Sequence, residues 1–570
     1  MTTTSERPLG PRLKRMAWQS GHRTLTRLLG LPAPTSDYNV DRGLRIPMRD
    51  GVELVADHYA PTGPVKGTLL VRGAYGRGFP VSLLLAQLYA TRGYHVVLQS
   101  VRGTADSGGE FHPLVHETSD GVDTVEWLRR QPWFTGRFAT IGQSYLGSTQ
   151  WALMMDPPAE LAAAIVTAGP HDFATSLWDT GAFRLNDSLG WADVMAHQEH
   201  GGRLKGLIWA AAARRRLARA TSGLPLGDSA RALLGEGASW FESWLRHHDP
   251  DHPYWEPLRF GAALDRVKVP VLLIGGWQDT FLRQTIEQYR QLRDRDADVA
   301  LTVGPWTHAQ LTTTGAARAA RESLEWLDWH LAGEREASRN PVRVWITGDH
   351  WVELADWPPP TSPRVLFLAP GGALTQSPPP EGGGASSFTY DPARPTSTIG
   401  GPLLLAPKSG YRDDTAMAER DDVVTFTSEP LASDLYVMGS PAVEFSHAAD
   451  IPHVDLFVRL SEVDERGRSR NVTESYRRLT AAAEPTDVRI ELDPTAHRFR
   501  AGSRIRLLVA GGAHPLFGRN SGTGEPAITA QRLVAATHTV HHGAQGSSRL
   551  FLPATTTRPS ADGAASSASA

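Results

Sequence analysis

The sequence predicts an α/β protein: a doubly wound parallel sheet, interrupted by a helical insertion and followed by an all-β domain. Up to about residue 340, short apolar runs alternate with helix-like segments, as expected for parallel strands covered by helices on both faces. The alternation stops between residues 170 and 264, where the chain is helical and rich in Trp and Ala. After residue 340, Pro and Gly clusters separate short β-branched runs, which is typical of a β-sandwich or jelly roll.

Composition limits the classes of function. A chain of 570 residues is long enough for about two to four domains. A net charge of −3 argues against a nucleic-acid or anionic-membrane partner. The absence of cysteine excludes a cysteine nucleophile, thiolate metal sites and disulfides. We see no secretory leader and no apolar run of the roughly 18 residues that a membrane helix needs, so we expect a cytoplasmic protein.

The elements of the sheet can be placed in chain order. The Asp-Gly turn at 49–51 indicates a hairpin within 40–59. Continuous apolar runs then predict buried parallel strands, with helices at 83–91 and around Val125 between them. These predicted strands are 68–71, 94–98, 138–141, 162–167, 269–275 and 299–303.

This order divides the chain into domains. We expect an N-terminal extension (1–37), a catalytic domain in two pieces (38–169 and 265–339) and a helical cap inserted at 170–264. A jelly-roll domain follows at 340–554. The Ser/Ala/Thr-rich end, 555–570, is expected to be a disordered tail.

The stretch 142–147, Gly142-Gln143-Ser144-Tyr145-Leu146-Gly147, resembles the G-x-S-x-G nucleophile elbow of α/β-hydrolases, with one extra residue before the second glycine. A short β-prone run precedes it. A proline-free segment from Tyr145 to Met155 follows it, as the strand–turn–helix geometry of an elbow requires. The alternative is a Gly-Ser turn met by chance. The flanks favour Ser144 as a nucleophile.

A serine nucleophile needs a histidine to accept its proton and a carboxylate to orient that histidine. In α/β-hydrolases the acid precedes the histidine in the chain. Asp279 follows one buried strand and His308 follows the next, so both belong at the edge that presents Ser144. His171, just past another strand, is the rival base, and Asp172 is the second choice of acid.

Two donors are needed to stabilise the oxyanion of an acyl-transfer reaction. The backbone N–H of Tyr145, which follows the nucleophile, is one candidate. The other donor normally comes from the loop after the third strand, where Tyr75 lies. Its hydroxyl is therefore a candidate, although a tyrosine at this place can also serve packing alone.

Several separated motifs resemble the CocE/NonD hydrolases, a cocaine-esterase-like group related to Xaa-Pro dipeptidyl-peptidases and α-amino-acid ester hydrolases. The resemblance spans about residues 40 to 553 and implies a hydrolase fold, a helical cap and a C-terminal jelly roll. It also implies Ser144, His308 and Asp279 as catalytic triad, with the Tyr75 hydroxyl and the Tyr145 N–H as oxyanion donors. The loop 73–75 reads Gly-Ala-Tyr where the family has a Thr-Pro-Tyr-like sequence, and Gln278 replaces an aromatic residue. The motifs are 46–52, 102–103 with 107–111, 142–147, 276–279, 304–308, 499–504 and 517–520.

We therefore predict a serine hydrolase that cleaves a small-molecule carboxylic ester or amide. The close alternative is an exopeptidase that removes Xaa-Pro dipeptides from short peptides. That activity needs carboxylates for the substrate's amino group, and the cap offers Asp172, Asp179, Asp187 and Asp193. A non-catalytic binding scaffold is the alternative of a different class. We expect no cofactor and no metal, since H-E-x-x-H is absent, and a homo-oligomer is possible.

Overall fold

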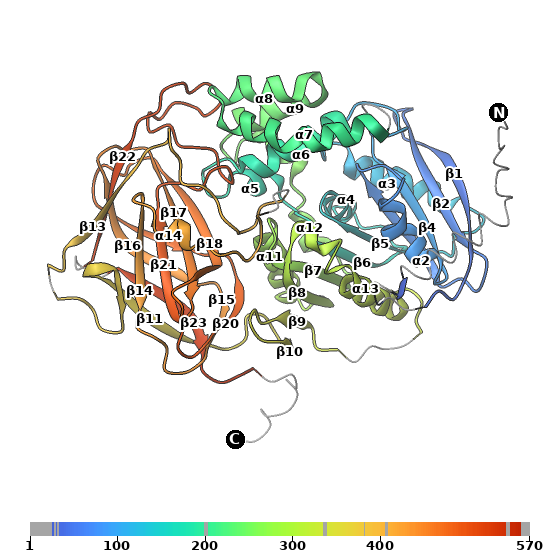
Figure 1. The fold of residues 1–570 in the computed structure, drawn as a ribbon. Coiled ribbons are helices and arrows are strands. Elements are labelled where there is room, and N and C mark those ends of the chain that lie inside the picture. Colours follow the sequence, from blue (N-terminus) through green and yellow to red (C-terminus); the bar gives the residue numbers. More distant parts are fainter. Residues whose placement is uncertain are drawn as a thin grey trace, which may run out of the picture.

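A computed structural model describes residues 26–27, 30, 33–198, 203–334, 339–380, 382–404, 408–542 and 548–559. Most of the predicted N-terminal extension and C-terminal tail lies outside these residues. The described chain forms two β layers side by side, with a group of helices above the space between them (Figure 1).

The first layer is a ten-stranded sheet with the order β1-β2-β4-β3-β5-β6-β7-β8-β9-β10. Pairing is parallel from β4 through β9, whereas β1, β2 and β10 pair antiparallel. This confirms the predicted doubly wound sheet. Its strands are β1 (Tyr38–Pro47), β2 (Glu53–Pro61), β3 (Gly67–Gly73), β4 (Tyr94–Ser100), β5 (Phe138–Gln143), β6 (Leu161–Thr167), β7 (Val271–Gln278), β8 (Val299–Thr307), β9 (Val342–Trp345) and β10 (Trp351–Leu354).

The end of this sheet differs from the sequence prediction. The prediction assigned everything after residue 340 to the β domain, but β9 pairs with β8 and β10 pairs with β9. By sheet membership the first layer therefore extends to Leu354. Strands β9 and β10 extend the sheet beyond its open edge at β8. This pairing depends on tertiary contacts, which the local sequence does not reveal.

Helices cover both faces of the sheet. In α11 (Leu282–Arg293), Leu282, Ile286, Tyr289 and Leu292 are buried, because helical spacing puts them on one face. The predicted helix at 83–91 is present and begins with a π-helical turn, η1 (Leu83–Gln87), continued by α2 (Leu88–Ala90). The remaining helices of this layer are α3 (Glu117–Arg129), α4 (Tyr145–Leu153), α12 (His308–Leu311) and α13 (Ala316–His330).

The insertion between β6 and β7 is helical, as predicted, and forms the upper part of the molecule in Figure 1. Its aromatic side chains pack together: the Trp191, Trp240 and Trp244 rings lie 4.3–5.9 Å apart between centroids. The elements are α5 (Phe173–Trp178), α6 (Leu185–His197), α7 (Arg203–Ser222), α8 (Leu226–Leu234), η2 (Gly235–Ala238), α9 (Trp240–Arg246), η3 (Pro253–Leu258) and α10 (Ala262–Arg266).

The second layer is all-β apart from the short α14 (Thr415–Ala418) and η4 (Pro370–Gly372). It has its own core, but Tyr436, Met438 and Ala496 join the core of the first layer. The two layers therefore share apolar contacts. The strands are β11 (Ser362–Ala369), β12 (Ala373–Thr375), β13 (Ala385–Tyr390), β14 (Val423–Ser428), β15 (Leu435–Gly439), β16 (Ala442–Ala449), β17 (Val454–Val463), β18 (Ser469–Leu479), β19 (Thr486–Glu491), β20 (Thr495–Phe499), β21 (Arg504–Ala510), β22 (Ala536–His541) and β23 (Arg549–Thr555).

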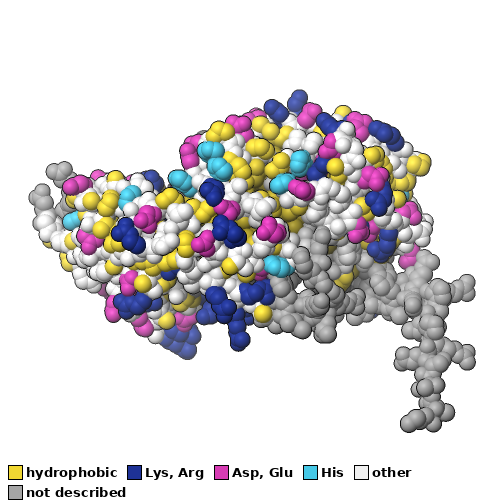
Figure 2. Space-filling model, turned by 90° about the horizontal axis from the view of Figure 1, so that it is seen from above, with side chains coloured by type: hydrophobic (Ala, Val, Ile, Leu, Met, Phe, Trp, Pro, Cys, Tyr) yellow, Lys and Arg dark blue, Asp and Glu magenta, His cyan; other side chains and the backbone are white. Residues whose placement is uncertain are grey.

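Acidic and basic side chains are intermixed over the face seen from above (Figure 2), in keeping with the small net charge. Arg214, Arg215 and Arg219 of α7 are exposed, so they lie on a solvated face of this helix. Among the described residues, no helix is both long and apolar enough to cross a membrane.

Helix α4 packs unusually close to the end of β6. A Cβ at Gly147 would lie 2.6 Å from the Gly169 Cα and 3.2 Å from the Val166 Cγ1. Only a glycine at position 147 lets the helix approach this closely.

We therefore expect Gly147→Ala to lower the free energy of unfolding by about 1–3 kcal/mol through overpacking. Thermal melting measures this, with Gly78→Ala as the control. A Cβ at Gly78 would have no atom of the described residues within 4 Å. Equal melting temperatures for the two variants would contradict the close packing.

Candidate active site

Ser144 occupies a strained turn between β5 and α4. Its φ of +61° and ψ of −125° lie in a region that residues with a side chain rarely adopt. Such strain persists only where the surroundings enforce it. The Ser144 N–H donates to the Thr167 carbonyl at 2.9 Å, and a Cβ at Gly142 would lie 2.4 Å from the Leu146 Cβ. This is the strand–turn–helix geometry of a nucleophile elbow.

Asp279 and His308 lie together. The His308 Nδ1 is 2.7 Å from the Asp279 Oδ2, and both residues are buried. The other Asp279 oxygen accepts the Phe281 N–H at 2.7 Å, which fixes the carboxylate. Because Nδ1 is engaged by the carboxylate, Nε2 is the ring nitrogen left for proton transfer.

The elbow and His308 are connected through Gln143. Its side-chain amide donates to the His308 carbonyl at 2.9 Å. Thr307 and Gln310 form a capping box that fixes the first turn of α12, which begins at His308. Within the described part of the chain, no hydrogen bond joins the Ser144 hydroxyl to the His308 ring. In hydrolases such bonds are often long in the free enzyme and shorten around substrate.

Tyr75 brings its hydroxyl to the elbow. This oxygen accepts a hydrogen bond from the Trp191 Nε1 at 3.1 Å, and it also interacts with the Ser144 side chain and the Tyr145 N–H. Burial raises the pKa of Tyr75, although these hydrogen bonds oppose the rise. The phenol therefore stays protonated at neutral pH and keeps a proton to donate.

A small cavity of about 60 Å³ opens at Ser144. Its lining is mostly apolar and comes from all three parts of the molecule, with Trp191 from the cap and Leu404 from the loop before α14. The sequence analysis did not single out either residue. The abundance of Trp in the cap was the one available signal for Trp191. The apolar lining is Leu114, Tyr145, Pro170, Phe173, Leu177, Trp191, Trp244, Phe281 and Leu404.

The rival residues have structural partners. His171 is buried, its Nδ1 is 3.2 Å from the Gln288 amide nitrogen, and burial lowers its pKa to about 4. Asp172 caps α5 by accepting the Thr175 N–H at 3.1 Å, and its carboxylate lies 3.4 Å from the Arg259 Nε. These contacts account for both residues without a catalytic role.

Most of the cap carboxylates are engaged too. Asp187 accepts hydrogen bonds from the Leu404 N–H at 2.8 Å and the Thr280 hydroxyl at 3.1 Å. Asp193 lies 3.2 Å from His197 and 3.5 Å from Arg216.

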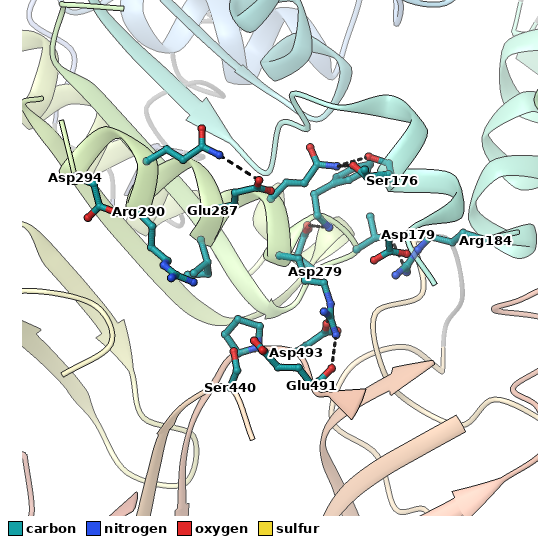
Figure 3. Close-up of a pocket in the computed structure, with 18 residues that line it drawn as sticks. Ser176, Asp179, Arg184, Asp279, Glu287, Arg290, Asp294, Ser440, Glu491 and Asp493 are labelled. Carbon is teal, nitrogen blue, oxygen red and sulfur yellow. Dashed lines mark hydrogen bonds and ion pairs between the residues drawn. The ribbon is translucent and has the colours of Figure 1, made fainter. Parts of the chain in front are cut away.

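Asp179 faces a second cavity, of about 550 Å³, between the cap, α11 and the β domain. Ser176, Arg184, Thr280 and Phe281 line both cavities, which therefore adjoin each other. Figure 3 shows how charged side chains surround the larger cavity, among them Asp179, Arg184, Glu287, Arg290, Asp294, Glu491 and Asp493.

Comparisons with known proteins agree with this architecture. Residues 50–310 match the X-Pro dipeptidyl-peptidase (S15) family, and residues 336–551 match the C-terminal non-catalytic domain of X-Pro dipeptidyl-peptidases. A cocaine esterase from Rhodococcus sp. (strain MB1 Bresler) is 30% identical over 91% of this chain and 99% of its own length. The chain belongs to the CocE/NonD family of serine hydrolases. This confirms the predicted resemblance and enzyme class, and it sets aside the non-catalytic scaffold.

More distant similarities also extend over most of the chain. A putative serine esterase of Mycobacterium bovis is 24% identical over 84% of this chain and 92% of its own length. The crystal structure of an aminopeptidase from a marine-sediment thaumarchaeon has a TM-score of 0.78 at 24% identity, covering 92% of this chain and 97% of its own. An α-amino-acid ester hydrolase gives the same TM-score at 23% identity, covering 92% and 98%. The predicted fold class, including the C-terminal β domain, is confirmed.

The contrast between the two histidines gives a direct test. We expect His308→Gln to lower kcat by roughly 10⁶-fold, as the loss of the base does in other serine hydrolases. His171→Gln should retain most of the activity, because His171 contacts Gln288 rather than the elbow. Steady-state hydrolysis of a p-nitrophenyl ester measures both variants. An active His308→Gln protein would refute the expected role of His308 as the general base.

Proposed function

We propose that this serine hydrolase cleaves carboxylic esters through an acyl-enzyme formed on Ser144. The observation that carries the proposal is the strained elbow, which puts Ser144, the Tyr75 hydroxyl and the Tyr145 N–H around one cavity. The short contact between His308 and Asp279 supplies a base of fixed orientation at the same edge of the sheet.

In the first half of the reaction, the Ser144 Oγ attacks the ester carbonyl carbon while the His308 Nε2 takes the hydroxyl proton. The negative charge that develops on the carbonyl oxygen is stabilised by the Tyr75 O–H and the Tyr145 N–H. His308 then gives its proton to the leaving alcohol as the ester bond breaks. In the second half, water attacks the acyl-enzyme by the same route and releases the acid. Throughout the reaction the Asp279 carboxylate accepts a hydrogen bond from the His308 Nδ1–H, which keeps the ring in one orientation.

The lining of the small cavity supports an apolar acyl group. Aromatic and aliphatic side chains make up most of its wall, and its two charged residues, Arg184 and Asp187, lie 3.7 Å apart. A charged acyl group would lose its hydration there without gaining an unengaged partner. The esterase name of the Rhodococcus relative also favours esters.

Cleavage of Xaa-Pro peptides remains the second candidate. It is supported by the family match and by Asp179, whose carboxylate is accessible from the larger cavity beside the catalytic pocket. Asp172, Asp187 and Asp193 are less suited to bind a substrate's amino group, because each is already engaged within the protein.

A substrate panel separates the two candidates. We expect hydrolysis of p-nitrophenyl esters with apolar acyl groups, and little release of p-nitroaniline from Gly-Pro-p-nitroanilide. A fluorophosphonate probe should label the wild type, whereas Ser144→Ala should be neither labelled nor active. Efficient Gly-Pro cleavage that Asp179→Asn abolishes would favour the peptidase instead. Labelling of Ser144→Ala would refute the nucleophile.

Tyr75→Phe tests the oxyanion donor. The variant removes one hydroxyl and keeps the ring, so kcat should fall by roughly 10²–10³-fold with little change in KM, as when one such donor is lost elsewhere. Tyr75→Ala serves as the comparison for packing. Normal kcat in Tyr75→Phe, with damage only in Tyr75→Ala, would show that the tyrosine serves packing alone.

A further inference from the structure

A buried polar chain lies directly behind the oxyanion site. The Tyr145 ring is buried, and its hydroxyl donates to the Glu117 Oε1 at 2.7 Å. The same hydroxyl accepts the Leu114 N–H at 3.0 Å. Tyr145 is therefore held at both ends: its backbone belongs to the elbow, and its side chain is fixed at the start of α3.

Glu117 is in turn held by Arg72. The Glu117 Oε2 lies 2.9 Å from the Arg72 Nη2, and both side chains are almost fully buried. The Arg72 Nη1 donates to the Glu117 backbone carbonyl at 2.9 Å. The Arg72 Nε donates to the Gln99 side-chain carbonyl at 2.7 Å. The guanidinium therefore fixes both the backbone and the side chain of Glu117.

The hydrogen-bonded series Tyr145–Glu117–Arg72 connects the two segments of the protein that carry the proposed oxyanion donors. Arg72 belongs to β3, and the loop that carries Tyr75 begins directly after this strand. Tyr145 supplies the other donor from its backbone. We propose that the Arg72–Glu117 ion pair, acting through the Tyr145 hydroxyl, holds the two oxyanion donors at their working separation. Arg72, Glu117 and the Tyr145 side chain are thus positioning groups, and the inference rests on the catalytic role proposed for Ser144.

Two physical arguments support a positioning role. A buried ion pair is a poor source of stability, because desolvation offsets most of the attraction between its charges. Catalysis, in contrast, is sensitive to position: a misplacement of about 1 Å can cost roughly 10²-fold in rate. Burial and the Glu117 charge raise the pKa of Tyr145 well above its usual range, so its hydroxyl remains a donor.

The position of Leu114 indicates that the same hydrogen-bonded series also shapes the pocket. Its φ of +68° is strained for a branched side chain, and its side chain lines the cavity at Ser144. The hydrogen bond from the Leu114 N–H to the Tyr145 hydroxyl holds this backbone in place. One hydroxyl therefore supports both a wall of the pocket and the residue that follows the nucleophile.

The same helix offers a matched control. Asp120, also buried in the first turn of α3, pairs with Arg102 at 2.7 and 3.0 Å. Its hydrogen bonds run to the loop after β4 rather than to Tyr145. Asp120→Asn therefore weakens a comparable buried pair and leaves the hydrogen bonds among Tyr145, Glu117 and Arg72 in place.

The test combines Glu117→Gln, Tyr145→Phe, the double variant and Asp120→Asn. We expect Tyr145→Phe to lower kcat on an apolar p-nitrophenyl ester by about 10- to 100-fold with nearly constant KM. Glu117→Gln should lower kcat in the same way. The double variant should lose no more than Tyr145→Phe alone, because Glu117 acts through that hydroxyl. Inhibition by phenylboronic acid, whose adduct with serine carries an anionic oxygen, should weaken in parallel with kcat.

Asp120→Asn should lower the melting temperature while leaving kcat close to that of the wild type. Wild-type kcat in Glu117→Gln and Tyr145→Phe, additive losses in the double variant, or equal losses in Asp120→Asn would each overturn the proposal. If Tyr145→Phe does not fold, the kcat of the isosteric Glu117→Gln variant, compared with that of Asp120→Asn, decides whether the positioning role holds. Tyr75→Phe is measured in parallel. If it lowers kcat while Tyr145→Phe does not, the oxyanion assignment stands and only the positioning role fails.

Discussion

The geometry of the site depends on the close approach of α4 to the ends of β5 and β6. Ser144 can hold a φ of +61° because Gly142 leaves room for Leu146, and because Gly147 packs directly against Gly169. Side chains at these glycines would push the helix away from the sheet. The Tyr145 N–H would then move relative to the Tyr75 hydroxyl, since the two come from different strands. The close packing of α4 on the sheet thus also fixes the positions of the polar groups at Ser144.

The cap and the β domain complete the site. Trp191 of the cap donates to the Tyr75 hydroxyl, which orients the phenol, and Leu404 closes the pocket from the β-domain side. Asp187 joins all three parts of the molecule, because its carboxylate accepts from Leu404 and from Thr280, the neighbour of Asp279. The second layer is therefore part of the pocket wall, and separately Tyr436, Met438 and Ala496 join it to the core of the hydrolase sheet.

Sequence patterns predicted those features that depend on chain order. The apolar strands before Asp279 and His308 indicated that both residues reach one sheet edge, and the structure brings them within 2.7 Å of each other. Trp191 and Glu117 could not be found in this way, since no periodic pattern marks the partner of a buried hydroxyl. Strand β9 was assigned to the wrong layer for a related reason: a short apolar strand is compatible with either sheet, and only the open edge of β8 decides.

The two adjoining cavities differ in polarity, and this difference bears on catalysis. Besides Asp279, which pairs with His308, five carboxylates line the larger cavity: Asp179, Glu287, Asp294, Glu491 and Asp493. Negative charges close to a developing oxyanion would oppose its formation, most strongly in an apolar pocket of low dielectric constant. Phe281 and Arg184 belong to the linings of both cavities, and Arg184 also lies 3.7 Å from Asp187. An aromatic residue and a cation are therefore placed where the two cavities adjoin, which favours an apolar pocket at Ser144 beside a more acidic cavity.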